Sequence, residues 1–214
     1  TVNGSIFPNE PTGVRASSVG AIKIGGSIDG SRTTLSSVEG LEIDAVKSLS
    51  IAGDLRASHI RIENLGIFHV GGSIIGGALP LSGLLSAVTV RSIFVGGDLR
   101  GGAGGLSGGI LVEGVVSKVT IRGSLIADDS SAENAALVAL DGAGKIHIGG
   151  NLIGGESGTA SLNGSDFKSV FIGGFIQGGV GENSAQLDLG AVGKLRVGSI
   201  IGGSGEGSGS LSLG

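Results

Sequence analysis

The chain lacks cysteine, methionine, tryptophan and tyrosine, and it has only three prolines in 214 residues. Without cysteine there are no disulfides, no thiolate metal sites and no cysteine nucleophile. Without tryptophan and tyrosine, the large aromatic platforms on which sugars and bases stack are missing. No apolar run approaches the 18 residues that suggest a membrane-spanning helix, so we expect no membrane span.

Positive charge is also scarce. There are 14 Lys and Arg residues against 18 Asp and Glu, which gives a formal charge of −4, and no basic cluster is longer than a dipeptide. Proteins that bind nucleic acid carry a basic patch or stripe, so we expect no nucleic-acid partner. The missing cysteines suit a secreted protein at a cell surface, and we expect an extracellular location.

Glycine is the most abundant residue type: its 46 residues are about three times the usual share of glycine in a protein. Glycine-rich chains are often disordered, but hydrophobic residues make up 40% of this one, enough to build a core. Collagen would need glycine at every third position and abundant proline, and neither is present. The composition therefore indicates a folded chain with many tight bends.

One sequence motif, typified by VRSIFVGGDL from Val90, recurs along the whole chain. Start-to-start spacings run from 19 to 27 residues and average about 25, the length of one repeating supersecondary unit. The eighth copy is one glycine short. The copies begin at Val19, Val46, Leu65, Val90, Val116, Ala143, Phe167 and Val192.

Within the motif, apolar and variable positions alternate with period two. The fourth and sixth positions are apolar in every copy, as in Ile93 and Val95, and the position between them varies. This pattern predicts a half-buried strand. Gly-Gly then bends the chain before a second short strand, and a third alternating segment lies upstream of most copies. We therefore predict three strands and three corners per repeat.

Three short strands in about 25 residues are what one coil of a parallel β-helix requires, because each coil buries its apolar residues only against its neighbours. We predict an all-β fold: a single right-handed, three-sided parallel β-helix (β-solenoid) domain over residues 1–214, with about eight to nine coils. A short helix is expected from Glu133 to Leu140. Longer excursions are expected at Ser31–Glu39, Gly77–Ser86, Gly101–Gly108 and Asp128–Asn134.

In repeat period and glycine content the chain resembles bacterial parallel β-helix surface proteins and exoproteins, such as autotransporter passengers and filamentous-haemagglutinin-like adhesins. The resemblance covers nearly the whole chain and rests on the pattern rather than on a diagnostic motif. It implies a secreted bacterial protein that serves in adhesion, surface coating or fibre formation. Such adhesins usually run much longer, so this chain is expected to be one segment or one subunit.

The two ends of the sequence are approximate complements of one coil. TVNGSIF matches the second half of the motif, and SLSLG matches a third-strand segment. Heterologous contacts that do not close produce open fibres, so we hypothesise head-to-tail stacking. The alternatives are a longer β-helix in which both ends continue into further coils, and a capped monomer. The predicted interface residues are Val2, Gly4, Ile6, Phe7, Leu211 and Leu213.

Two pairs of aromatic residues occupy the outward fifth position of adjacent copies. The register places Phe94 one coil above His69, and Phe171 one coil above His147. We interpret them as ladders that stabilise the stack, with an exposed patch for a partner as the alternative. The three histidines are not clustered, so no metal site or general base is expected from them.

The position after Gly-Gly is a small polar residue in most copies, which we interpret as local capping of backbone N–H groups. Asp occupies it in only two copies, too few for a calcium-binding roll. Asp128-Asp129 is the only acidic pair, and we interpret it as a loop or helix cap rather than a glycosidase pair. We expect no enzyme activity, catalytic residue, cofactor or metal.

The leading functional hypothesis is a structural, self-assembling extracellular subunit that stacks into a filament or surface layer, with itself as the main partner. The alternative is an adhesin stalk or a carbohydrate-binding β-helix segment that meets a cell surface or a polysaccharide, its likeliest site being near His69 and Phe94. An enzyme that acts on polysaccharide comes third.

Overall fold

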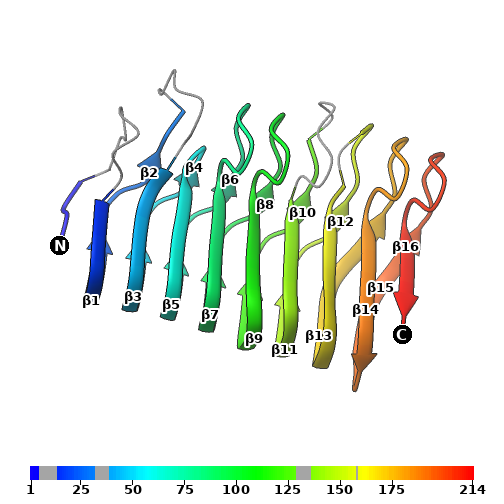
Figure 1. Cartoon of the computed structure of the whole chain (residues 1–214). Coiled ribbons are helices and arrows are strands. Elements are labelled where there is room, and N and C mark those ends of the chain that lie inside the picture. Colours follow the sequence, from blue (N-terminus) through cyan, green and yellow to red (C-terminus); the bar gives the residue numbers. More distant parts are fainter. Residues whose placement is uncertain (5–13, 32–38, 129–135, 158) are drawn as a thin grey trace.

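The computed structural model describes residues 1–4, 14–31, 39–128, 136–157 and 159–214. All its strands join one parallel β-solenoid, and consecutive coils lie side by side from the N-terminal to the C-terminal end (Figure 1). The predicted all-β parallel β-solenoid is therefore confirmed.

Each coil from β1 to β12 contains one long and one short strand. The long strands are β1 (Val14–Ile24), β3 (Glu39–Ile51), β5 (His59–Val70), β7 (Leu84–Val95), β9 (Gly109–Ile121), β11 (Leu137–Ile148) and β13 (Ser161–Gln177). The short ones are β2 (Ile28–Asp29), β4 (Leu55–Arg56), β6 (Ile74–Ile75), β8 (Leu99–Arg100), β10 (Leu125–Ile126) and β12 (Leu152–Ile153). The last coils hold β14 (Gln186–Val192), β15 (Leu195–Ile201) and β16 (Ser210–Leu213).

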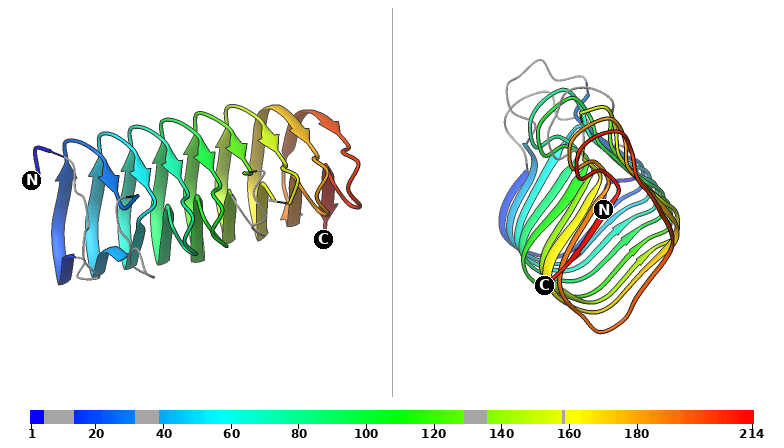
Figure 2. Two further views of the ribbon diagram at one scale, coloured as in Figure 1. Left: turned by 90° about the horizontal axis from the view of Figure 1, so that it is seen from above. Right: turned by 90° about the vertical axis from the view of Figure 1, so that its right-hand side faces the viewer.

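Long strands pair with long strands and short with short, always parallel and one coil apart. Both ladders meet in β13, which pairs with β11 and β12 on one side and with β14 and β15 on the other. The coil count was wrong: there are about seven turns, not eight to nine, because eight motif copies are separated by seven steps and the end segments are partial coils (Figure 2).

From β1 to β12 each coil has two strands instead of the predicted three, because the upstream segment and the motif strand form one unbroken strand. In β13 all three segments form one strand, and β14 and β15 separate at the bend. In β5, Glu63 and Asn64 are consecutive and both exposed, and the strand turns there without losing its pairing to β7. Because period-two alternation breaks phase at that bend, the sequence pattern predicts two strands where the structure has one. A change of phase in the alternation marks a corner, but up to β13 it does not end the strand.

The core consists of apolar columns that run along the axis. In one coil its members are Ile60, Ile62, Leu65, Phe68, Val70 and Ile74, all buried. The matching residues of the next coil, from Leu85 to Leu99, pair with them in register. Each coil therefore covers the apolar surface of its neighbours, as the repeat predicts.

Core volume is balanced between neighbouring columns. Phe167 is buried where its column partner in the preceding coil is the small Ala143. A Cβ placed on Gly164 would lie 2.5 Å from the Phe167 ring and 2.5 Å from the Leu140 carbonyl oxygen. The phenyl ring thus fills space left by two small residues, which keeps the interior close-packed.

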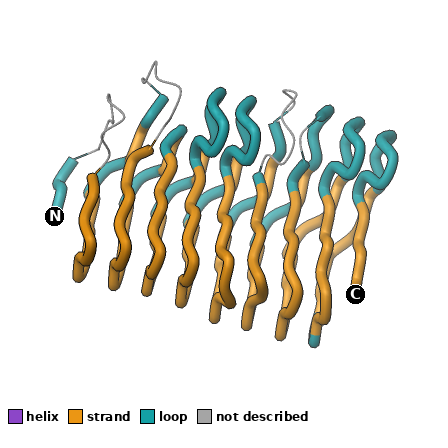
Figure 3. Tube along the Cα trace, in the orientation of Figure 1, coloured by secondary structure: helices purple, strands orange, loops and turns teal. Residues whose placement is uncertain are grey.

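The described loops leave the coils at the same corner, before the next long strand (Figure 3), and the β4–β5 connection is only Ala57 and Ser58. The Gly101–Gly108 excursion has the predicted bounds. The Gly77–Ser86 excursion was predicted too long, because β7 begins at Leu84. Residues 32–38 and 129–135, which make up most of the other two, lie outside the described residues.

The helix predicted from Glu133 to Leu140 is wrong where it can be compared. Residues 133–135 lie outside the described part of the chain, but β11 begins at Leu137 and continues through Leu140. Pairing of Val138 with Ile110 on one side and with Leu162 on the other holds this segment extended. Tertiary pairing therefore overrides the local preference of the alanine-rich sequence.

Replacing Phe167 by Ala should lower the free energy of unfolding by about 3–5 kcal/mol, because the ring leaves a cavity beside Ala143 and Gly164. Urea unfolding followed by circular dichroism measures this. The control is Ile67→Ala, which removes a side chain that is 47% exposed on β5 and should cost under about 0.5 kcal/mol. Equal shifts for the two variants would contradict this packing.

Candidate functional site

The first predicted interface residues lie on the first coil. Val2 pairs with Ile24: its N–H donates to the Lys23 carbonyl at 2.8 Å, and its own carbonyl accepts from Gly25 at 2.7 Å. The Gly4 carbonyl accepts from Gly26 at 3.1 Å. Residues 2–4 therefore add a rung that begins partway round a coil. Ile6 and Phe7 lie outside the described residues.

The last coil leaves its apolar columns uncovered. Leu213 is 55% exposed, whereas its in-register partner Leu189 is 1% exposed. Ile200 is 45% exposed above the fully buried Ile176. Leu211 is likewise exposed above Leu187. This end of the solenoid presents the surface that another coil covers elsewhere in the chain.

The aromatic pairs stack as the register predicted. The rings of His69 and Phe94 have centroids 4.8 Å apart and planes within 5°. His147 and Phe171 have the same separation and planes within 11°.

Arginine completes each aromatic stack on the side away from the histidine. The Arg122 guanidinium carbon lies 5.2 Å from the Phe94 centroid, and that of Arg196 lies 5.4 Å from the Phe171 centroid. Because the histidine comes from the preceding coil and the arginine from the following one, both faces of each phenylalanine are occupied. The rings thus hold coils together and offer only their edges to a partner.

The polar residues after Gly-Gly cap backbone N–H groups as predicted, but the capped groups belong to the next coil and are not local. The Asp54 N–H donates to Ser27 Oγ at 2.9 Å, and the Ser73 N–H donates to Asp54 Oδ1 at 2.7 Å. Each side-chain oxygen accepts from the equivalent residue one coil later. The ladder continues through Asp98, Ser124 and Asn151 and ends at the N–H of Phe175.

Both aspartates of this ladder also hold an arginine of their own coil. Asp54 Oδ2 lies 2.7 Å from Arg56, and Asp98 Oδ2 lies 2.8 Å from Arg100. One carboxylate oxygen therefore joins two coils while the other binds a guanidinium. This double role accounts for Asp at these corners without any calcium ion.

Four serines that were not predicted as functional residues stabilise the loops by accepting backbone hydrogen bonds. Ser82 Oγ accepts the N–H of Gly77 at 2.7 Å, and Ser107 Oγ accepts that of Gly102 at 2.9 Å. Ser184 and Ser208 bond in the same way to the glycine five residues before them. The spacing Gly-Gly-x-x-x-x-Ser is visible in the sequence and would have identified these residues.

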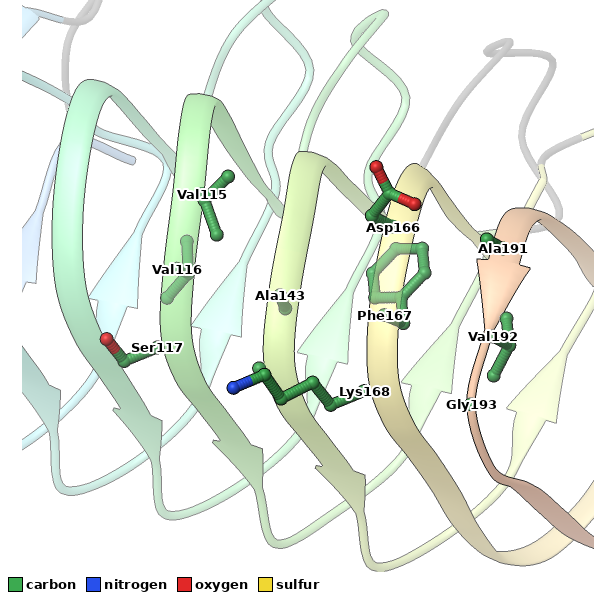
Figure 4. A pocket seen from close by; sticks show the side chains of 11 residues that line it. Val115, Val116, Ser117, Ala143, Asp166, Phe167, Lys168, Ala191, Val192 and Gly193 are labelled. Atoms are coloured by element: carbon green, nitrogen blue, oxygen red, sulfur yellow. The ribbon is translucent and has the colours of Figure 1, made fainter.

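A shallow groove of ≈ 660 Å³ runs along the corner between the two halves of the long strands, from β9 to β14. Ala143, Gly144 and Gly193 give it its depth, since none has a large side chain. Figure 4 shows Asp166 on one wall and Lys168 on the other. The groove was not predicted, because its residues come from four coils.

No three His, Asp or Glu side chains among the described residues come together to hold a metal ion. Of the acidic pair, Asp128 is the last residue of its described segment, and Asp129 lies outside the described residues. In the same part of the chain, no helix is long and apolar enough to cross a membrane.

No protein-family model, curated protein sequence or solved structure matches this chain. The resemblance to autotransporter passengers and filamentous-haemagglutinin-like adhesins thus remains a prediction from the repeat pattern.

Asp98 variants separate the two roles of the corner carboxylate. Asp98→Asn keeps an oxygen for the Ser124 N–H and loses the ion pair with the exposed Arg100, which should cost at most about 1 kcal/mol. Asp98→Ala also leaves that N–H without its acceptor and should cost about 1–3 kcal/mol more. Urea midpoints measure both, and equal losses would show that the coil-to-coil bond is unimportant.

The aromatic stacks make a second prediction. Phe94→Leu should lower the free energy of unfolding by about 1–2 kcal/mol, because leucine keeps apolar area but loses the His69 stack and the Arg122 contact. Phe171→Leu, in the same column, is the matched case and should give a similar loss. Unchanged thermal unfolding in both variants would favour a binding patch over a structural ladder.

Proposed function

We propose that this chain is a structural, self-assembling β-solenoid subunit that elongates end to end, the last coil of one copy covering the first coil of the next. The observation that carries this proposal is the uncovered last coil, where Ile200, Leu211 and Leu213 continue columns that are fully buried one coil earlier.

Backbone hydrogen bonds between strand edges would orient the contact made at this apolar surface. In the interior of the solenoid, each long strand hydrogen-bonds to a neighbour on both sides. Strand edges with unpaired N–H and C=O groups act as templates for another strand. Because one end differs from the other, the contact is heterologous, and repetition of it builds an open filament instead of a closed dimer.

The proposed setting is extracellular, in a bacterial fibre or surface layer. Support comes from composition and repeat type: the chain has no cysteine, and its glycine-rich coils resemble those of secreted β-helix proteins. The corner ladder and the aromatic stacks join neighbouring coils, and the loop serines stabilise the loops, which suits a rod that must resist separation of its coils.

An adhesin stalk is the second candidate, and the same observation supports it. Further coils of one longer polypeptide would cover Leu211 and Leu213 as well as a second copy would. The two candidates differ in whether this 214-residue chain polymerises when it is purified.

Negative-stain electron microscopy of the purified chain across a concentration series distinguishes them. Self-assembly should give uniform thin filaments with an axial repeat of roughly 35–40 Å, the length of about seven turns at about 4.8 Å each plus the partial end coils. The double variant Ile200→Lys/Leu213→Lys should abolish filaments, because two charges would be buried in each junction.

The matched control is Val115→Lys/Val180→Lys, which adds the same two charges at side positions that are 66% and 64% exposed, and it should still form filaments. Monodisperse short rods of the unaltered chain at every concentration would overturn self-assembly and favour the stalk.

A further inference from the structure

Folding gathers cations onto one face of the rod although the sequence disperses them. The outward residues of each long strand, between its buried corner residue and its C-terminal end, form what we call the basic face. Lys118, Lys145, Lys168 and Lys194 lie on it in four consecutive coils. Lys23, Lys47 and Arg91 lie on it nearer the N-terminal end. All seven side chains are exposed.

Within the part of the chain that the structure describes, none of these seven cations forms an ion pair. None of the described outward residues on the basic face is acidic, and the described ion pairs involve Arg56 and Arg100 elsewhere. Lys118 and Lys145 even stand directly opposite one another in register. Like charges in that position destabilise a sheet, so stability does not explain the arrangement.

The acidic residues line the other half of the same long strands. Asp44, Glu63, Glu113 and Asp141 all follow the buried residue before the bend and are exposed. Surfaces of soluble proteins usually intersperse the two signs. A single-sign field along one face is typical of binding to a charged partner.

The groove described above runs along the boundary between the two halves, beside the four C-terminal lysines. Lys168 stands on the wall that adjoins the basic face, and Asp166 stands on the opposite wall with Val115 (Figure 4). Four coils at about 4.8 Å each make a straight trough about 14 Å between its first and last coil. Its walls offer an ammonium donor on one side and a carboxylate acceptor on the other.

A linear acidic polysaccharide fits these features better than the other polyanions. Its carboxylate or sulfate groups can pair with the ammonium groups of the four lysines beside the groove, and its hydroxyls can donate to Asp166. Single-stranded nucleic acid needs aromatic faces for its bases, and both faces of Phe94 and Phe171 are already occupied.

We propose that the groove and the adjoining lysines, Lys118, Lys145, Lys168 and Lys194, bind a linear acidic polysaccharide that runs parallel to the rod axis. The binding is electrostatic with hydroxyl contacts to Asp166, and it is independent of end-to-end assembly. Neutralising these lysines also relieves the repulsion between Lys118 and Lys145.

Isothermal titration calorimetry with alginate, a linear polyuronate, tests the proposal, with neutral dextran as the comparison polymer. The variant Lys118→Gln/Lys145→Gln/Lys168→Gln should bind alginate at least tenfold more weakly than the unaltered chain. The matched control, Lys23→Gln/Lys47→Gln/Arg91→Gln, removes the same charge from the same face away from the groove and should lose less than threefold. High salt should weaken binding by the unaltered chain.

A second measurement does not depend on how the variants fold. Alginate should raise the thermal midpoint of the unaltered chain, and dextran should not, because only a ligand of the native state stabilises it. Equal losses in the two variants, no thermal shift, or equal binding of dextran would overturn the proposal.

Two other results would also overturn it. Tighter binding of single-stranded DNA than of alginate would indicate a nucleic-acid surface. Lateral association of rods without added polymer, lost only in the Lys118→Gln/Lys145→Gln/Lys168→Gln variant, would indicate that the occupant is a second copy of the chain.

Discussion

Parallel pairing of each coil with the next, in one fixed register, is the constraint on which every other feature depends. A single coil of about 25 residues cannot enclose a core, so its six inward side chains become buried only when neighbours cover them. A shift by one residue would turn those side chains to solvent. The register therefore fixes the apolar columns, and Phe167 shows how closely volumes are matched within them.

The same register converts positions that are distant in sequence into continuous lines on the surface. Ser27, Asp54 and Ser73 become a ladder because each oxygen meets the N–H of the equivalent residue one coil later. His69, Phe94 and Arg122 become one stack. Lys118, Lys145 and Lys194 fall in one column, in which Ser169 stands between Lys145 and Lys194, and Lys168 lies one residue away. Structural and binding features of this rod are thus products of stacking, and they would disappear together if the coils separated.

Features that follow from the repeat period, such as strands, corners and register, can be predicted from the sequence. Features that depend on whether adjacent segments form one strand, or on residues from several coils, cannot. Ile93 and Val95, with Gly-Gly after them, identify the strand and its corner, and the register correctly places Phe94 on His69. Alternation cannot tell a bent strand from two strands, which is why three segments were predicted where two exist. Neither the groove at Ala143 and Gly144 nor the group of four lysines has a local signal, because their members lie on separate coils. The loop serines had a signal in their spacing.

The most direct test of fixed-register stacking is a distance series between spin labels in the cysteine-free chain. Cysteines at Lys47 and Ser117 would lie three coils apart in one exposed column, and cysteines at Lys47 and Lys168 would lie five coils apart. Stacking at about 4.8 Å per coil predicts narrow distributions near 14 and 24 Å, so the second distance exceeds the first by about 10 Å. Broad distributions, or two distances that do not grow with the number of coils, would contradict the solenoid.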